Sequence, residues 1–103
     1  MRIYISGPIT GTTDYMERFA DAERRLWDDG WDDITNPAAK NARFPEGTSW
    51  ETYMGESLKM LCACDAIYMM RGWRGSRGAR LELMVAMELG LKIVIVEREN
   101  DKK

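Results

Sequence analysis

The sequence predicts an α/β protein in which four parallel strands alternate with crossover helices. Three observations predict this class: short apolar segments alternate with segments of helical periodicity, glycine-rich turns follow two of the apolar segments, and the last apolar segment, Leu91–Glu97, contains an Ile-Val-Ile-Val run. An apolar run without polar alternation is typical of a parallel strand covered on both faces. With 103 residues, we expect a single domain, 1–103, without an internal repeat or linker.

The first unit is a strand, a turn and a helix. Residues Arg2–Ser6 alternate and are rich in β-branched and aromatic types, which predicts a strand. The turn Gly7–Gly11 follows, and Thr13 or Asp14 is placed to cap the next helix. Gly30 fits the position that ends this helix. The residues expected on its apolar side are Phe19, Ala22, Leu26 and Trp27.

The middle of the chain predicts a short strand, a loop and a second helix. Trp31–Thr35 is a weak strand candidate, which Asn36-Pro37 ends because the residue before a proline avoids helical backbone angles. Residues 37–48 are expected to form a loop. Ser49 is expected to cap a helix over about 50–62 or 63. The apolar side of this helix is expected to comprise Tyr53, Met54, Leu58 and Leu61.

The last part of the chain predicts two strands joined by a glycine-rich turn and a helix. Asp65–Met70 is the third strand, the helix covers about Gly78–Gly90, and Leu91–Glu97 is the fourth strand. The charged tail, Arg98–Lys103, is expected to be frayed. Because ligands of parallel sheets bind at the carboxyl ends of the strands, the turns after the first and third strands are expected to share a binding edge.

The composition excludes several classes of function. A net charge of −2 gives no general attraction to nucleic acid or to an anionic membrane, and no apolar run is long enough to span a bilayer. With no histidine, mechanisms that pair histidine with serine or cysteine are excluded. Cys62 and Cys64, expected to be small buried residues, are too few for a structural zinc site. We expect no metal, no cofactor, no signal peptide and a cytoplasmic location.

The segment 72–82, Gly-Trp-Arg-Gly-Ser-Arg-Gly-Ala-Arg-Leu-Glu, carries the clearest candidate site. Ser76, Arg77 and Gly78 fall at the start of a helix, where backbone N–H groups without intrahelical partners bind anions. Glu82 lies one turn further along, where a carboxylate can act as nucleophile or base on a phosphorylated small molecule. The alternatives are that Glu82 complements the helix dipole and that Ser76 is only a helix cap.

Several motifs together resemble the nucleoside 2-deoxyribosyltransferase superfamily, and most of all its small bacterial and phage branch, a domain of unknown function. They are Ile-Tyr-Ile-Ser-Gly-Pro-Ile near the start, Asn36-Pro37, Trp50 with Tyr53-Met54, Cys64-Asp65-Ala66-Ile67-Tyr68, and Gly-Trp-x-x-Ser-x-Gly-Ala-x-Leu-Glu. The resemblance covers nearly the whole chain. It implies a flavodoxin-like three-layer sandwich, a homodimer or higher homo-oligomer, and cleavage or exchange of the N-glycosidic bond of a nucleoside or nucleotide.

The resemblance also implies roles for individual residues. Glu82 matches the nucleophilic glutamate, and Tyr4 matches a tyrosine near the sugar. The loop that borders the ligand matches Gly7, Pro8 and Ile9. Ser76 matches the serine that binds the 5′-phosphate in the 2′-deoxynucleoside 5′-phosphate N-hydrolases, which favours a phosphorylated ligand over a free nucleoside.

Two positions depart from the pattern of the superfamily. Ser57 stands where an aspartate usually positions the nucleophile and handles the proton of the base, and Thr10 stands where the nucleotide hydrolases have a phosphate-binding arginine. Glu56, Asp65 or a group of a partner subunit are candidates for the missing acid. Three functions therefore stay open: an N-glycosidase or transferase, a nucleotide-binding protein that lost the chemistry, and an interaction domain that uses the helix 79–89.

Some residues have two interpretations. Trp73 can stack on a nucleobase or lie in a subunit interface, and Asp65 is a turn residue or a further substrate-binding residue. The helix 79–89 is apolar nearly all round, which indicates a two-fold dimer interface or a central helix of a monomer. A cluster of arginines either is a solvated surface or attracts phosphate. Its members are Arg71, Arg74, Arg77 and Arg80.

Overall fold

The sheet has four parallel strands. The computed structural model describes residues 1–96, and the predicted frayed tail and the last residue of the predicted fourth strand lie outside this part of the chain. The strands are β1 (Ile3–Ser6), β2 (Ile34–Thr35), β3 (Ala66–Met69) and β4 (Lys92–Ile95). Their order is β2-β1-β3-β4, with Tyr4 aligned with Thr35 on one side and Ile67 on the other. The predicted α/β class with parallel strands is therefore confirmed.

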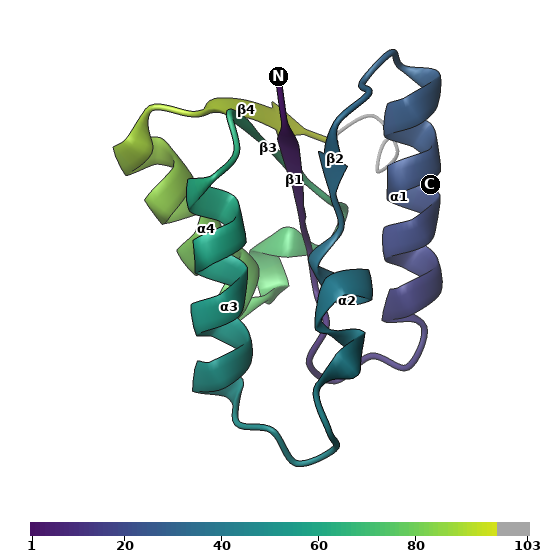
Figure 1. Cartoon of the computed structure of the whole chain (residues 1–103), viewed down its shortest axis with the longest axis vertical. Helices are drawn as coiled ribbons and strands as arrows, with labels where there is room; N and C mark the ends of the chain where they lie inside the picture. Colours follow the sequence, from purple (N-terminus) through teal and green to yellow (C-terminus); the bar gives the residue numbers. More distant parts are fainter. Residues whose placement is uncertain (97–103) are drawn as a thin grey trace.

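Helices cover both faces of the sheet and make a three-layer sandwich (Figure 1). The helices α1 (Tyr15–Asp28) and α2 (Pro37–Lys40) cover one face, and α3 (Trp50–Cys62) and α4 (Arg77–Leu89) cover the other. The alternation of β1 supplies both layers, because successive side chains of a strand point to opposite faces. Ile3 and Ile5 pack with Phe19 and Leu26 of α1. Tyr4 packs in the other core, with the side chains that α3 and α4 contribute.

The strand order reverses between β1 and β3. The chain passes from β1 through α1 to β2 on one side, and β3 then pairs with the other side of β1. Gly7 follows β1, where an added Cβ would lie 2.7 Å from the sulfur of Met70, so only glycine fits this crossing of two turns. Gly72, with a φ of +89°, makes the turn that follows β3. Crevices at such reversals are the usual ligand sites of open α/β sheets.

The segment predicted as a loop over 37–48 contains two short helices, which is a correction. These are α2 and the 3-10 helix η1 (Asn41–Arg43). The side chain of Asn36 caps α2 by accepting a hydrogen bond from the backbone N–H of Ala39 at 3.2 Å, and Pro37 holds the first helical position. The second strand is also shorter than predicted, because only Ile34–Thr35 pairs with β1.

The edge of the sheet formed by β4 is less covered than predicted. β4 is an edge strand whose residues are exposed or half-buried, so the expectation of a strand covered on both faces is wrong for the single chain. On α4, Ala79, Glu82 and Ala86 face inward, whereas the side chains of Met84 and Met87 are 61% and 62% exposed. The interpretation of α4 as a central helix of a monomer is therefore wrong.

The predicted side-chain caps are present at the N-termini of two helices and absent from a third. Ser49 and Ser76 cap α3 and α4, each accepting a backbone N–H at 3.1 Å. Asp14 occupies the cap position of α1 but makes no side-chain capping bond.

Trp27 of α1 is half-exposed and Cys62 is exposed, which corrects the expectation that both are buried. Within residues 1–96, no helix has the length and apolar character needed to cross a membrane.

Candidate functional site

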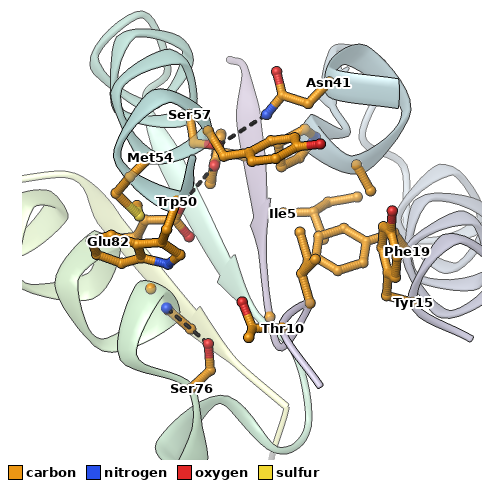
Figure 2. Close-up of a pocket in the computed structure, with 18 of the residues that line it drawn as sticks. Ile5, Thr10, Tyr15, Phe19, Asn41, Trp50, Met54, Ser57, Ser76 and Glu82 are labelled. Atoms are coloured by element: carbon orange, nitrogen blue, oxygen red, sulfur yellow. Dashed lines mark hydrogen bonds between the residues drawn. The ribbon is translucent and has the colours of Figure 1, made fainter. Parts of the chain in front are cut away.

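A pocket of about 330 Å³ lies at the carboxyl end of the sheet, at the reversal of strand order. It is bounded by β1, the turn after β1, the segment from α2 to η1, and the first turns of α3 and α4. Figure 2 shows side chains from both layers converging on it. Much of the wall is aromatic, which suits a flat ring system. The aromatic residues are Tyr4, Tyr15, Phe19, Trp50 and Tyr53.

Glu82 is the one carboxyl group among the described residues that line this pocket. It lies in the second turn of α4, and only 7% of its surface is exposed. Two residues of β1 hold its two oxygens: Tyr4 donates its hydroxyl to Oε2 at 2.6 Å, and Ser6 donates its hydroxyl to Oε1 at 2.5 Å. Each carboxylate oxygen has a further lone pair, so the group can still act on a ligand.

The surroundings of Glu82 change its acidity. Burial raises the pKa of Glu82 from its ordinary value to about 7, because a charged carboxylate is disfavoured away from water. The hydrogen bonds from Ser6 and Tyr4 lower this pKa, since they stabilise the charged form. Burial, followed by the charge of Glu82, raises the pKa of Tyr4 well above its usual range. Tyr4 therefore stays a hydroxyl donor at neutral pH.

A second pair of polar side chains continues this network into the pocket wall. Ser57 on α3 is hydrogen-bonded to Tyr4 and lowers the pKa of its phenol, which is the effect of a donor. Asn41 of η1 in turn donates from Nδ2 to the hydroxyl of Ser57 at 3.2 Å. Donors thus run in one direction from Asn41 through Ser57 and Tyr4 to Glu82.

The first turn of α4 borders the other end of the pocket. Ser76 and Gly78 line it together with Gly7, Ile9 and Thr10 from the turn after β1. The start of α4 carries the backbone N–H groups for which the sequence predicted anion binding. Thus Ser76, Gly78, Gly7 and Ile9, predicted from sequences far apart in the chain, are brought together with Tyr4 and Glu82.

Arg77 lies beside this end of the pocket. Its guanidinium carbon is 4.1 Å from the centre of the Trp50 ring, in a cation–π contact that joins the first turns of α4 and α3. Another member of the predicted arginine cluster, Arg80, donates to the backbone carbonyl of Arg74 at 2.9 Å. The contact with the tryptophan ring places Arg77 against Trp50, a residue that lines the pocket.

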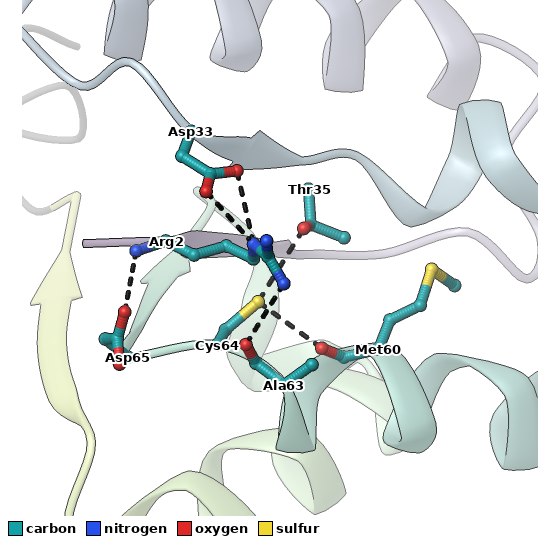
Figure 3. A network of polar contacts seen from close by, with 7 residues as sticks. All are labelled: Arg2, Asp33, Thr35, Met60, Ala63, Cys64 and Asp65. Carbon is teal, nitrogen blue, oxygen red and sulfur yellow. Dashed lines mark hydrogen bonds and ion pairs between the residues drawn. The ribbon is translucent and has the colours of Figure 1, made fainter.

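Asp65 and Pro8, both predicted site residues, lie outside the pocket lining. Asp65 precedes β3 and so lies at the amino end of the sheet, opposite the pocket, where it accepts the backbone N–H of Arg2 at 2.8 Å. Figure 3 shows this polar network, in which Arg2 also pairs with Asp33 at 3.2 Å. Pro8 turns toward Gly72 rather than into the pocket, since its Cγ lies 3.4 Å from where a Gly72 Cβ would be.

Trp73, a predicted base-stacking residue, is half-buried and is not among the residues that line the pocket. It belongs to η2 (Trp73–Gly75), lies against the core under α3 and α4, and carries the guanidinium of Arg74 at 4.6 Å from its ring centre. Because the ring is only partly buried, its two predicted roles, base stacking and a subunit contact, stay predictions. Glu56, a candidate acid, points away from the pocket and pairs with Lys59 at 3.3 Å.

Sequence reasoning missed Ser6 and Asn41. Ser6 could have been found, because the two-residue period of a strand puts it on the same face as Tyr4. Asn41 begins η1, the second of the two short helices in the segment predicted as a loop, so no periodicity located it. Phe19 was assigned to the apolar side of its helix and Tyr15 was given no role, because the contribution of both to the pocket depends on the tertiary packing of α1 on the sheet.

The fold and the pocket define a flavodoxin-like α/β protein with a pocket at its switch point. Residues 1–95 match the model of the family described as a domain of unknown function (DUF4406), and the chain belongs to this family. Among solved structures, it is similar to a 2-desoxiribosyltransferase from Leishmania mexicana, with a TM-score of 0.64 and 26% sequence identity. The match covers 91% of this chain but only 62% of that enzyme. The comparison with curated proteins found no match.

Proposed function

We propose that the pocket binds a nucleoside or deoxynucleoside 5′-phosphate and that Glu82 attacks C1′ of its sugar. The observation that carries this proposal is the buried Glu82 carboxyl, held at both oxygens by Tyr4 and Ser6 in an aromatic pocket. Similarity to a 2-desoxiribosyltransferase supports the same class of substrate. A fixed carboxylate is the group that forms a covalent intermediate at the anomeric carbon of a sugar.

The phosphate would bind at the start of α4. Ser76 and Gly78 line that end of the pocket, and the N–H groups of a helix N-terminus favour an anion. Thr10, in place of an arginine, leaves this end without a charged partner from the turn after β1. The phosphate affinity would then rest on the helix N-terminus and on the hydroxyl groups of Ser76 and Thr10.

The proposed reaction has two displacements at C1′. The Glu82 carboxylate forms a bond to C1′, the bond from C1′ to the base nitrogen breaks, and the base leaves with the electron pair and takes up a proton. Water or a second base then attacks C1′, which releases the sugar phosphate or a new nucleotide and regenerates the carboxylate. Two inversions retain the configuration at C1′.

A second function, nucleotide binding without chemistry, is favoured by one specific observation. Departure of a base needs an acid, and Glu82, the only carboxyl group in the described lining, is already used as the nucleophile. Ser57 fills the position of the aspartate and is occupied by Asn41 and Tyr4. A protein that senses or sequesters a nucleotide would keep this pocket and its phosphate end.

One experiment separates the two functions. Purified protein is incubated with nucleosides and their 5′-monophosphates, free base is quantified by chromatography, and the melting temperature is recorded on the same samples. Release of base that disappears in Glu82→Ala supports the enzyme. A higher melting temperature without base release supports the binding protein, and the absence of both effects contradicts both functions.

We further propose that the exposed face of α4 forms a homodimer interface. Met84, Met87 and Leu89 are exposed on α4, and Ile95 is exposed on the adjacent edge strand β4. Exposed apolar side chains on a helix and on the edge strand that it contacts are typical of a contact between subunits.

A further inference from the structure

Asn41 has an incompletely satisfied amide in the wall of the pocket. Only 8% of its surface is exposed, and its Nδ2 donates to Ser57 at 3.2 Å. Its Oδ1 is buried and has no hydrogen-bond partner among residues 1–96. A buried polar atom without a partner costs about 1–3 kcal/mol, so an unpaired amide in a ligand pocket points to a partner supplied from outside the protein.

The hydrogen bond with Ser57 uses the nitrogen of this amide. Nδ2 of Asn41 is the donor and the Ser57 hydroxyl oxygen is the acceptor, which leaves Oδ1 outside the bond. The Asn41 amide therefore keeps one N–H and Oδ1 uncommitted. These two atoms form the edge of a carboxamide that pairs with adjacent donor and acceptor atoms of a nucleobase.

The position of Asn41 agrees with this chemistry. Figure 2 shows Asn41 and Ser76 at opposite ends of the pocket, with Glu82 between them. If the phosphate binds at Ser76 and C1′ faces Glu82, the base extends toward Asn41. Tyr53 also lines the pocket, and the edge-to-face contact of its ring with Phe44, at 5.3 Å between centroids, holds it in place.

We infer that Asn41 is the residue that selects the base, by hydrogen-bonding the polar edge of a nucleobase, with Ser57 as the positioning residue that sets the orientation of its amide. This inference rests on the proposed function, because it takes the ligand to be a nucleotide. It adds that the pocket discriminates among bases and that the discrimination comes from η1 rather than from the helix that carries Glu82.

The test compares ligands with and without a base. Binding of the four common deoxynucleoside 5′-monophosphates and of 2-deoxyribose 5-phosphate is measured by calorimetry for the parent protein and for Asn41→Leu, which keeps a similar volume. A hydrogen bond is worth about 0.5–1.5 kcal/mol, so we expect Asn41→Leu to bind the preferred nucleotide roughly three- to tenfold more weakly. Its affinity for 2-deoxyribose 5-phosphate should stay within about twofold, because that ligand does not reach Asn41.

A second variant guards against a change in folding. Asn41→Asp keeps the shape of the side chain and replaces the N–H donor by an acceptor, so the rank order of the four nucleotides should change. The inference is overturned if either variant weakens all five ligands by the same factor, or if the parent protein binds the four nucleotides equally. If the parent protein binds none of the five, the proposed function fails as well, and the two failures are thereby told apart.

Discussion

The hydroxyl of Tyr4 lies 2.6 Å from Oε2 of Glu82, and both side chains are buried. Tyr4 belongs to the central strand β1 and Glu82 to α4, so this bond joins the middle of the sheet to the helix that borders the pocket. The bond also couples the protonation of the two groups. Glu82 raises the pKa of Tyr4, and the hydrogen bond from Tyr4 lowers the pKa of Glu82. Stability and chemistry are expected to depend on pH through the same pair.

The first prediction is that the protein becomes less stable as the pH rises from about 5 to 8. The pKa of Glu82 is about 7 in the folded state and 4.5 ordinarily, so between these values the folded protein holds a proton that the unfolded chain has released. Raising the pH through this range therefore lowers the free energy of unfolding, by at most roughly 3 kcal/mol. Urea unfolding at several pH values measures the slope.

Glu82→Gln is the matched variant for this prediction. The amide is uncharged at every pH, so the variant lacks the contribution of Glu82, while the other titrating groups contribute alike to both proteins. The difference between the two stability curves isolates Glu82. Parallel curves between pH 5 and 8 would show that the carboxyl of Glu82 is not shifted in the folded protein.

The second prediction concerns base release. The attacking group is the ionised carboxylate of Glu82, so the rate should rise with pH and level off above about 7. Tyr4→Phe removes a hydrogen bond that lowers the pKa of Glu82, and the midpoint should then move to higher pH by roughly one unit. The measurement is the pH profile of kcat/KM.

Ser6→Ala gives an independent reading of the same effect. The bond from Ser6 also lowers the pKa of Glu82, so its loss should move the midpoint in the same direction without altering an aromatic ring. An acidic shift in either variant would contradict the assignment of the midpoint to Glu82.

The fold was predictable because local patterns agreed with each other. The apolar segments, the caps Ser49 and Ser76, and the glycine turns all indicated one parallel sheet, and the residues at its carboxyl edge followed from that topology. The same rule should have excluded Asp65, because a residue that precedes a parallel strand lies at the amino edge. Tyr4 and Glu82 could be paired only through the motif, since they are distant in sequence.

The part of the pocket wall that comes from η1 was not predictable in the same way. Asn41 reaches the pocket because Asn36 and Pro37 start a four-residue helix, and such a helix is too short to show periodicity. The partial burial of Trp73 depends on how η2 packs against the core beneath α3 and α4, which is a tertiary contact. The exposure of Met84 likewise follows from the angle at which α4 lies on the sheet.

The third prediction is that the protein is a dimer through α4. Because Met84 and Met87 are exposed in the single chain, replacing both by lysine should leave the fold intact but place charges in the proposed interface. Sedimentation equilibrium should then give a dimer for the parent protein and a monomer for the double variant, with unchanged circular dichroism. A monomeric parent protein would contradict the interface.

The fourth prediction contrasts two glycines that receive the same methyl group. In Gly7→Ala the new Cβ would lie 2.7 Å from Sδ and 2.9 Å from Cβ of the buried Met70, so the turn and Met70 must move apart. Overpacking of this kind costs about 1–3 kcal/mol of unfolding free energy. Because Gly7 also lines the pocket, the ligand affinity should fall with the stability.

Gly55→Ala is the control for Gly7→Ala. Gly55 lies inside α3, where an added Cβ meets no atom within 4 Å, so alanine should stabilise the helix by roughly 0.5–1 kcal/mol. Urea unfolding of both variants should therefore give changes of opposite sign. Equal changes would show that backbone entropy, and not the contact with Met70, decides the effect at Gly7. Opposite changes would establish that the turn after β1 is packed tightly against Met70, the residue that follows β3.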